Sequence, residues 1–389
     1  MRKELVFVLL ALFLCAGCNG NKKKMNGEHD LDAANITLDD HTISFYYNWY
    51  GNPSVDGEMK HWMHPIALAP GHSGDVGAIS GLNDDIACNF YPELGTYSSN
   101  DPEIIRKHIR MHIKANVGVL SVTWWGESDY GNQSVSLLLD EAAKVGAKVC
   151  FHIEPFNGRS PQTVRENIQY IVDTYGDHPA FYRTHGKPLF FIYDSYLIKP
   201  AELNDHGVKR AKLFAAGGEI SVRNTKYDGL FIGLTLKESE LPDIETACMD
   251  GFYTYFAATG FTNASTPANW KSMQQWAKAH NKLFIPSVGP GYIDTRIRPW
   301  NGSTTRDREN GKYYDDMYKA AIESGASYIS ITSFNEWHEG TQIEPAVSKK
   351  CDAFEYLDYK PLADDYYLIR TAYWVDEFRK ARSASEDVQ

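Results

Sequence analysis

Eight short apolar segments recur along the chain, and most of them are separated by enough residues for a helix. Each segment is rich in β-branched or aromatic residues and ends in a turn signal, and an amphipathic stretch usually follows it. Nearly continuous apolar runs such as Leu189-Phe190-Phe191-Ile192 predict parallel strands that are covered on both faces. The eight expected strands span residues 42–47, 117–122, 148–153, 189–193, 230–234, 251–255, 283–288 and 328–332.

Helical patterns separate these segments, and several of them carry start or stop signals. Asp101 followed by Pro102 is the usual pair at the start of a helix, while Gly146 and Gly325 stand where a helix normally stops. The alternation of eight strands with helices predicts the α/β class, as a single (β/α)8 TIM barrel with elaborated βα loops. The expected helices span residues 102–115, 134–145, 162–174, 268–280, 313–324 and 364–382.

Residues 41–383 form one continuous expected domain, because no repeat or low-complexity block interrupts them. An open doubly wound sheet is the alternative arrangement of the same elements. No Gly-x-Gly-x-x-Gly turn follows the first strand, however, so the nucleotide binding that often accompanies such a sheet has no support. Residues 51–100 are long for one connection and carry His, Trp and Pro, which predicts an elaborated loop over the barrel mouth.

The first residues have the features of an export signal. Arg2 and Lys3 precede an apolar run at residues 5–14 that is too short to span a bilayer, and small residues lead to Cys18. The stretch resembles a bacterial lipoprotein signal, so we expect a signal peptide over residues 1–17, a lipid on Cys18 and a flexible tether over residues 18–40. An ordinary secretory signal is the alternative. Lipidation predicts a protein held at the bacterial cell envelope by its lipid anchor only, at the outer membrane surface or the periplasmic face.

Charge and cysteine spacing restrict the partners of the chain. With 50 acidic and 39 basic side chains the net charge is −11, and no basic tract exists beyond residues 22–24, which argues against a nucleic-acid partner. The cysteines of the expected domain have no metal-ligand spacing, so we expect neither a metal nor another cofactor, and a single disulfide bridge stays open. These cysteines are Cys88, Cys150, Cys248 and Cys351. We expect a monomer.

Aromatic and polar side chains gather just past the ends of the expected strands. Because the carboxyl ends of barrel strands meet on one face, these residues should share one surface. The chain has 24 Tyr, 18 Phe and 9 Trp, and surplus rings beside carboxylates and amides are typical of a site for a neutral sugar, whose C–H faces stack on rings. The residues of this kind include Tyr46, Tyr47, Trp125, Glu154, Tyr193, Tyr253 and Arg296.

Glu336 and Glu339 follow the last expected strand and are three residues apart, a spacing that places both on one side of a helical turn. Two carboxylates that close cannot both ionise easily, so the pKa of one is raised and an acid stands beside a base. Glycoside cleavage needs this combination, because the departing oxygen takes a proton while the anomeric centre needs a negative partner. The alternative is a solvated turn in which both glutamates face water.

Four short motifs resemble glycoside hydrolase family 99, the endo-α-mannosidases and bacterial endo-α-1,2-mannanases. They are YYNWYGNP at residues 46–53, HWMHP at residues 61–65, HIEP at residues 152–155 and SFNEWHEGT at residues 333–341. The similarity extends over residues 42–380. It implies a (β/α)8 barrel that cuts within an α-mannan or a mannose-rich glycan, cleaves α-1,2-mannosidic linkages with retention of configuration and uses no metal.

The resemblance also assigns roles to single residues. It implies that Glu336 takes the proton from the 2-hydroxyl of the sugar, so that a 1,2-anhydro sugar forms, and that Glu339 acts first as acid and then as base. The substrate-binding residues that it implies are Tyr46, Tyr47, His61, Trp62, Trp125, Glu154, Tyr193, Tyr253 and Arg296. Tyr255 and Arg298 are alternatives to the last two.

Two other functions use the same residues. A non-catalytic lipoprotein that captures glycans would need the aromatic surface, but it would not need two adjacent carboxylates and their electrostatic cost. A barrel glycosidase that forms a covalent intermediate on a carboxylate would need the pair but not the 2-hydroxyl of the substrate. The sequence therefore predicts an endo-acting mannan hydrolase, and the two alternatives stay open at this point.

Overall fold

The computed structural model describes residues 36–74, 76–195 and 209–386. The expected signal peptide, Cys18 and most of the expected tether lie outside these residues. The first strand begins at Asp39, inside the last part of the segment expected to be a tether. Asp39 is fixed there because its N–H donates to the carbonyl of Asn116 at 2.9 Å and its carboxylate accepts two bonds from Arg382, at 2.6 and 3.1 Å.

Parallel strands form the barrel that the sequence predicts. The order of neighbours is β11, β10, β9, β8, β6, β5, β1, β13 and β12, and every adjacent pair in this order is parallel. β11 and β12 are the two halves of the expected strand at 283–288. They are divided at Pro286, which has no N–H for a strand ladder, and the ring of strands closes through this segment. The barrel strands are β1 (Asp39–Tyr46), β5 (Val117–Trp124), β6 (Lys148–Ile153), β8 (Lys187–Ile192), β9 (Leu230–Leu234), β10 (Gly251–Tyr253), β11 (Leu283–Ile285), β12 (Ser287–Val288) and β13 (Ile329–Ile331).

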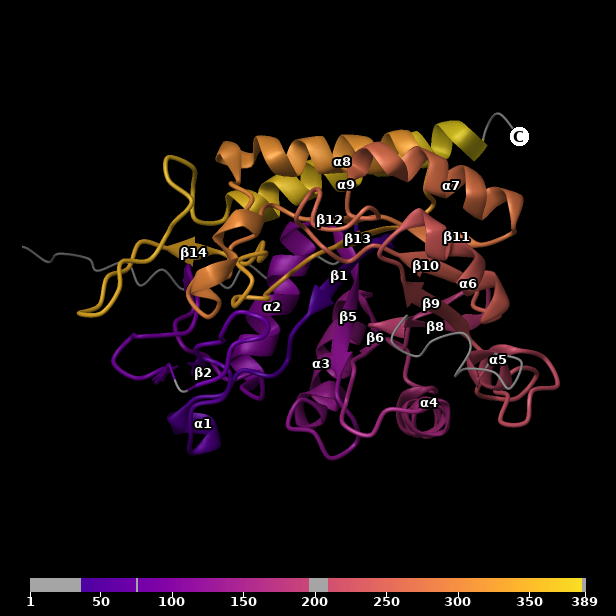
Figure 1. Cartoon of the computed structure of the whole chain (residues 1–389), viewed down its shortest axis with the longest axis horizontal. Helices are drawn as coiled ribbons and strands as arrows, with labels where there is room; N and C mark the ends of the chain where they lie inside the picture. The colour runs from indigo at the N-terminus through magenta and orange to yellow at the C-terminus, as the bar shows by residue number, and fades with distance from the viewer. Residues whose placement is uncertain (1–35, 75, 196–208, 387–389) are drawn as a thin grey trace, which may run out of the picture. The chain divides into compact units, whose positions relative to one another are not determined.

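Helices lie on both sides of the strands in Figure 1. Asp101 caps the first long helix by accepting from the N–H of Glu103 at 2.8 Å, and Gly146 and Gly325 end two others with left-handed φ angles of 80° and 76°. The long helices are α2 (Pro102–Lys114), α3 (Asn132–Val145), α4 (Pro161–Tyr175), α7 (Trp270–Ala279), α8 (Lys312–Ser324) and α9 (Tyr366–Glu386). Two short helices, α5 (Lys209–Phe214) and α6 (Leu241–Thr246), were not expected, because six residues are too few to show a helical period.

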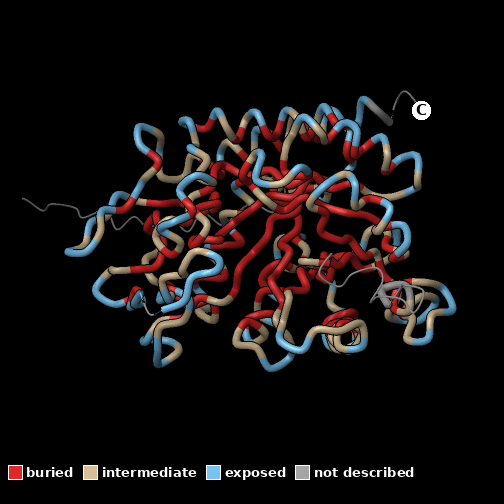
Figure 2. Tube along the Cα trace, in the orientation of Figure 1, coloured by how far each residue is buried: buried red, intermediate tan, exposed pale blue. Residues whose placement is uncertain are grey.

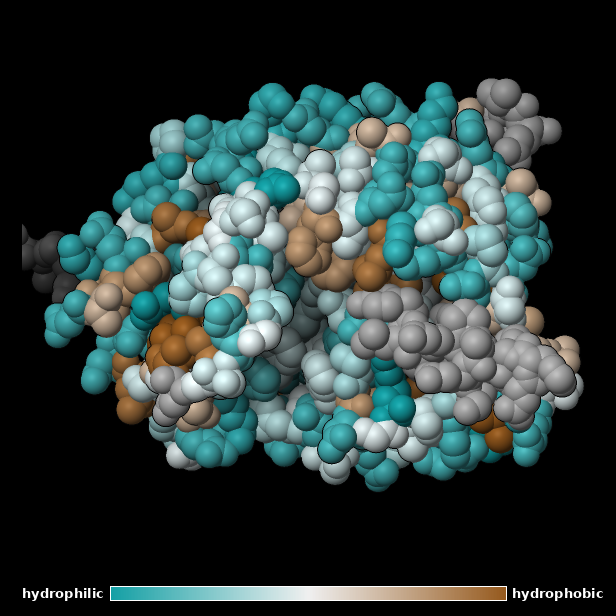
Figure 3. Space-filling model, viewed as in Figure 1, coloured by the Kyte–Doolittle hydropathy of each residue, from teal (hydrophilic) through white to brown (hydrophobic). Residues whose placement is uncertain are grey.

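The strands carry the most continuously buried part of the chain, as Figure 2 shows. Side chains of β1, β8 and β10 meet inside the ring, where the ring of Phe45 lies 5.2 Å from that of Phe191 and 5.7 Å from that of Tyr253. The molecular face in Figure 3 is mostly hydrophilic, with apolar side chains in small separate patches. Among the described residues, no helix is both long and apolar enough to cross a membrane, and the four cysteines of the domain are free.

The long connection after β1 is built from short elements rather than from one lid. Its indole Trp62 stacks on Tyr50 at 4.2 Å and donates to the carbonyl of Tyr97 at 2.8 Å, so the loop is tied to itself near the barrel mouth. Two antiparallel pairs, β2 with β3 and β4 with β14, brace it. The short elements of this connection are α1 (Pro53–Asp56), β2 (His64–Pro65), β3 (Ala78–Ile79) and β4 (Tyr91–Pro92), and β14 (Ala346–Val347) comes from the segment after β13. A further short strand, β7 (Arg183–Thr184), lies elsewhere and pairs antiparallel with β8.

Candidate active site

A cavity of about 320 Å³ opens at the carboxyl ends of the barrel strands. A neighbouring cavity of about 440 Å³ shares Trp49, His61 and Trp125 with it, so the two have a common wall of rings. Segments far apart in the chain supply the lining because each follows a different strand of the same barrel. The lining residues of the first cavity are Tyr47, Trp49, His61, His64, Trp125, Glu154, Pro155, Tyr193, Tyr255, Ile297, Arg298, Glu336, His338 and Glu339.

Glu336 is the more deeply buried of the two carboxylates, with 3% of its surface exposed. One oxygen, Oε1, accepts from the backbone N–H of His338 at 3.2 Å. The other, Oε2, is buried and has no hydrogen-bond partner among the described residues. Burial raises the pKa of Glu336 well above its ordinary value, and the negative charge of Glu339 raises it further. Oε2 of Glu336 is therefore free to accept a hydrogen bond from a ligand hydroxyl.

Glu339 faces the same cavity and keeps 20% of its side chain exposed. Burial raises its pKa to about 7, although the positive charge of Arg298 acts in the opposite direction. The Nη1 atom of Arg298 lies 3.9 Å from Oε1 of Glu339 and 2.9 Å from the carboxylate of Asp294. A carboxyl group that titrates near neutral pH can donate and accept a proton in turn.

The backbone that carries the pair is an irregular turn, so the expectation of a helical turn was wrong. The N–H of Glu336 donates to Oγ of Ser333 at 2.7 Å, and the N–H of Thr341 reaches back to the carbonyl of Glu336 at 3.4 Å. One of these bonds goes to a side chain and the other joins residues five apart, so neither belongs to the regular pattern of an α-helix. The two carboxylates still line one cavity, as the sequence predicts.

Glu154 follows β6 and lines the same cavity as the carboxylate pair. Its Oε1 accepts from the hydroxyl of Thr123 at 2.7 Å and lies 3.2 Å from Nδ1 of His152. The other ring nitrogen of His152 is 2.6 Å from the hydroxyl of Tyr253. Tyr253 is therefore fully buried against His152 and does not line the cavity, and Tyr255 takes the place at the cavity wall.

Aromatic rings cover much of the remaining wall. Trp49 stacks on His61 with ring centres 4.6 Å apart and planes within 2°, and Trp125 lies 6.4 Å from Trp49. On the far side, Tyr193 packs edge-on against Tyr255 at 4.9 Å. Ring faces of this kind suit the C–H faces of a sugar. The cavity thus combines a stacking surface with carboxylates, as a neutral polyhydroxylated ligand requires.

Three more of the predicted binding residues do not line the cavity. Tyr46 points away because successive strand residues face opposite sides, and its hydroxyl bonds Nδ1 of His108 at 2.9 Å. Trp62 lies wholly within the loop core described above. Arg296 bonds Asp85, with its guanidinium 4.2 Å above the ring of Phe354. Arg298, two residues on, takes the position beside Glu339.

Several lining residues were not singled out from the sequence. Trp49, His64, Pro155 and His338 belong to the quoted motifs, so proximity to a motif was the available signal. Burial lowers the pKa of His338 to about 3, which keeps its imidazole neutral beside Glu336. Ile297 lies outside the quoted motifs, so nothing in the sequence marked it as a lining residue. Among the described residues, no group of three or more His, Cys, Asp or Glu side chains is placed to hold a metal ion.

Comparisons with known proteins agree with the resemblance seen in the motifs. The chain matches the model of glycosyl hydrolase family 99 over residues 37–380. It is 46% identical over 356 residues to the glycoprotein endo-α-1,2-mannosidase of Mus musculus, which covers 87% of this chain and 75% of that protein. A related mannosidase-like protein of Homo sapiens is 46% identical over 355 residues, with 87% and 76% covered. A solved structure of the GH99 endo-α-mannosidase from Bacteroides thetaiotaomicron is 98% identical, with a TM-score of 0.86, and covers 89% of this chain and 99% of that chain.

Proposed function

The chain belongs to glycosyl hydrolase family 99 and is an endo-acting α-mannosidase, and we propose that it cleaves internal α-1,2-mannosidic linkages of α-mannan or of a related N-glycan arm. The named activity of the Mus musculus relative supports the linkage. Cleavage within a chain needs space for sugar units beside the one that reacts. The neighbouring cavity behind Trp49 and Trp125 offers such space.

One observation carries the proposed chemistry, namely the unpartnered Oε2 of Glu336 next to a carboxyl group that titrates near neutral pH. Burial disfavours two negative charges in one cavity, so the pair holds at least one proton at neutral pH. A sugar hydroxyl that donates to Oε2 stabilises the ionised form of Glu336. Binding of substrate thereby favours the proton on Glu339, where the leaving oxygen needs it.

In the first step, Glu336 removes the proton from the 2-hydroxyl of the mannosyl unit. In an α-mannoside O2 and the leaving O1 are both axial and on opposite faces, so the electron pair of O2 attacks C1 from behind. The C1–O1 bond breaks with its electrons on O1, which takes the proton of Glu339. The product is a 1,2-anhydro sugar, and no carboxylate forms a bond to carbon.

In the second step, Glu339 is a carboxylate and takes a proton from water. The water oxygen attacks C1 from the face that the leaving group left, the C1–O2 bond breaks, and Glu336 returns its proton to O2. Two inversions at C1 give overall retention of configuration. Both glutamates end in their starting states, so the cycle needs no cofactor.

Substitution of each carboxylate tests these roles. Glu339→Gln and Glu336→Gln should each abolish release of manno-oligosaccharides from α-mannan while affinity for the glycan persists. Glu355→Gln is the control, because its side chain is 73% exposed and lines neither cavity of the site. A Glu339→Gln protein with near-normal turnover would reject Glu339 as the acid. A wild-type protein that binds mannan but never liberates reducing ends would instead support glycan capture.

A substrate without the 2-hydroxyl separates the anhydro route from a covalent intermediate on a carboxylate. If the mannosyl unit at the cut carries hydrogen in place of this hydroxyl, O2 is absent and the first step cannot occur. Hydrolysis of the deoxy substrate at a rate near that of the parent would refute the anhydro intermediate and favour a carboxylate nucleophile.

The N-terminal prediction becomes a proposal of its own: a lipid on Cys18 anchors a monomeric protein to the bacterial envelope. Cys18 lies outside the described residues, and the sequence pattern supports the proposal. Cys18→Ser should move the protein from the membrane fraction to the soluble fraction with unchanged turnover. Sedimentation of the Cys18→Ser protein at one chain mass would support a monomer, and unchanged membrane association would reject the anchor.

A further inference from the structure

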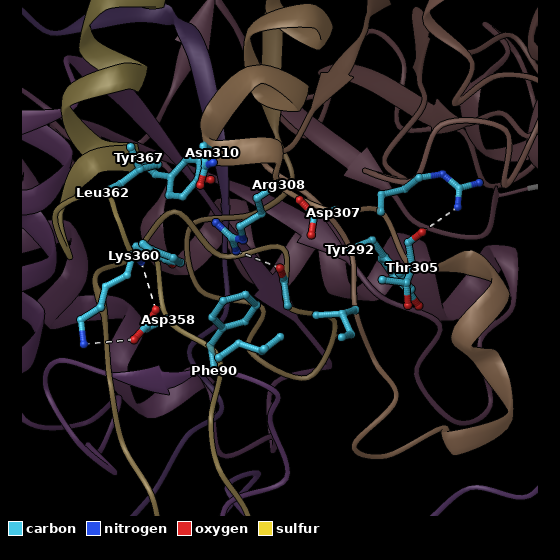
Figure 4. Close-up of a pocket in the computed structure, with 15 residues that line it drawn as sticks. Phe90, Tyr292, Thr305, Asp307, Arg308, Asn310, Asp358, Lys360, Leu362 and Tyr367 are labelled. Carbon is cyan, nitrogen blue, oxygen red and sulfur yellow. Dashed lines mark hydrogen bonds and ion pairs between the residues drawn. The ribbon is translucent and has the colours of Figure 1, made fainter.

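A third cavity, of about 170 Å³, is lined by Arg308 and by residues from several distant segments of the chain (Figure 4). It shares no lining residue with the cavity that contains the carboxylate pair. Glu339 lines the cavity of the carboxylate pair and Gly340 lines the third cavity, so the backbone between these two residues is the wall that separates the two cavities. A contact that fixes this backbone from the third cavity therefore also fixes the Cα atom from which the Glu339 side chain extends.

Arg308 is the charged group at the back of this wall. Its guanidinium carbon lies 4.7 Å from the ring centre of Phe90, 4.7 Å from that of Tyr359 and 4.6 Å from that of Tyr367. Three rings from different parts of the chain thus surround one cation, and each is within the range of a cation–π contact. Among the described residues, no carboxylate lies within ion-pair distance of Arg308, so its charge is balanced by rings and by carbonyl groups.

The guanidinium of Arg308 donates two hydrogen bonds to the segment after Glu339. Its Nη2 donates to the carbonyl of Gly340 at 2.9 Å and to that of Gln342 at 2.8 Å. Nε and Nη1 are buried and have no acceptor among the described residues. A guanidinium that leaves two donors unused is costly to bury. A neutral side chain would fill the same space at a lower desolvation cost. What Arg308 adds is therefore the pair of hydrogen bonds to the carbonyls of residues 340 and 342.

The wall is fixed from a second side as well. The N–H of Ile293 donates to the carbonyl of Glu339 at 2.8 Å. Gly340 has a φ of +60°, and a Cβ added there would lie 2.6 Å from the side chain and 2.7 Å from the carbonyl of Ile293. With Ile293 holding one carbonyl and Arg308 holding the next, the backbone on the C-terminal side of Glu339 has little freedom.

We infer that Arg308 is a positioning residue, which holds the Glu339 carboxyl in place for proton transfer by anchoring the carbonyls of residues 340 and 342. The inference rests on the proposed role of Glu339. Arg308 does not reach the cavity in which the reaction takes place, so its removal should change turnover and leave substrate binding nearly intact. Displacement of a catalytic group by about 1 Å can lower a rate by about 100-fold.

Arg308→Lys in the full chain is the first test. Lys keeps a cation among the three rings, but its ammonium ends nearer the backbone than Nη2 does and cannot bridge both carbonyls. We expect kcat on α-mannan oligosaccharides to fall by about 10- to 100-fold with KM within about twofold of wild type. Arg306→Met is the matched control, because Arg306 lines the same cavity and donates to Thr259, Ser303 and Thr305 instead. Its kcat should be unchanged.

Chemical rescue is the second test. Arg308→Ala leaves a space that opens to the cavity, so added methylguanidinium at millimolar concentration should restore kcat several-fold, while the same concentration of sodium chloride should not. Rescue of Arg308→Ala, with no effect of methylguanidinium on the kcat of Arg306→Met, supports positioning, and so does the selective fall in kcat of Arg308→Lys. A folded Arg308→Lys protein with wild-type kcat overturns the inference, as does an inactive Arg308→Ala protein that methylguanidinium cannot rescue. If Glu339→Gln itself kept full turnover, the proposed function would fail instead.

Discussion

Replacing Glu339 with Gln should stabilise the folded protein at alkaline pH while it abolishes turnover. The folded carboxyl has a pKa raised to about 7 by burial, against an ordinary value of 4.5. Because the folded state binds this proton more tightly than the unfolded state does, the associated stability is fully present below pH 4.5 and is lost as pH rises through about 7. Gln has the shape of the protonated acid and cannot ionise, so it escapes that loss.

The size of the effect follows from the two pKa values. The difference between about 7 and 4.5 corresponds to about 3 kcal/mol of unfolding free energy. At pH 8 the Gln protein should be more stable than wild type by about this amount, and at pH 4.5 the two should be nearly equal. For a domain of this size, about 3 kcal/mol corresponds to about 4 °C in unfolding temperature.

Thermal and urea unfolding of both proteins at pH 4.5, 6, 7 and 8 measure this difference. Asp39→Asn is the control, because Asp39 is also buried but accepts two bonds from Arg382, so its removal should lower stability rather than raise it. A Glu339→Gln protein with no gain at pH 8 would refute the reasoning. So would a gain of the same size at pH 4.5, because the effect would then not come from ionisation.

Three further outcomes are expected. The kcat/KM of the wild type should fall as pH rises above about 7, where Glu339 loses its proton. In a pH–rate profile, Arg298→Met should move this fall to higher pH, because the charge of Arg298 lowers the pKa of Glu339, whereas Arg296→Met should not move it. Trp125→Ala should raise KM by about tenfold through loss of a stacking face, and an unchanged KM would remove Trp125 from the binding surface. Gly340→Ala should destabilise the fold by about 1–3 kcal/mol, because its φ is +60° and its Cβ would meet Ile293, and a Tm equal to wild type would contradict this.

The barrel could be predicted from the sequence because its strands are buried on both faces. Such strands read as short apolar runs whatever their neighbours are, and the run at residues 148–153 coincides with β6. The helical connections between consecutive strands then allow only a few orders of these strands in a sheet. The short helices α5 and α6 were missed because they contain too few residues to establish a period.

The candidate site was predictable where its residues are close in sequence. Glu336 and Glu339 line one cavity whether the backbone between them is a helix or the observed turn, because only two residues separate them. Which of Tyr46 and Tyr47 faces the cavity depends on which residues of β1 point into the barrel, and the sequence did not show where this strand would begin. The choice between Arg296 and Arg298 depended on Asp85 and Asp294, which capture one arginine each.

By itself, the sequence determined the strand–helix alternation, the family and the segment that carries the carboxylate pair, because these follow from local burial patterns and from residues that are neighbours along the chain. Only the tertiary structure decided which side chains face the cavity and how strongly they hold protons. A side chain's direction depends on partners contributed by distant segments, as Arg308 depends on Phe90, Tyr359 and Tyr367. The raised pKa of Glu339 likewise depends on burial, which no stretch of the chain produces alone.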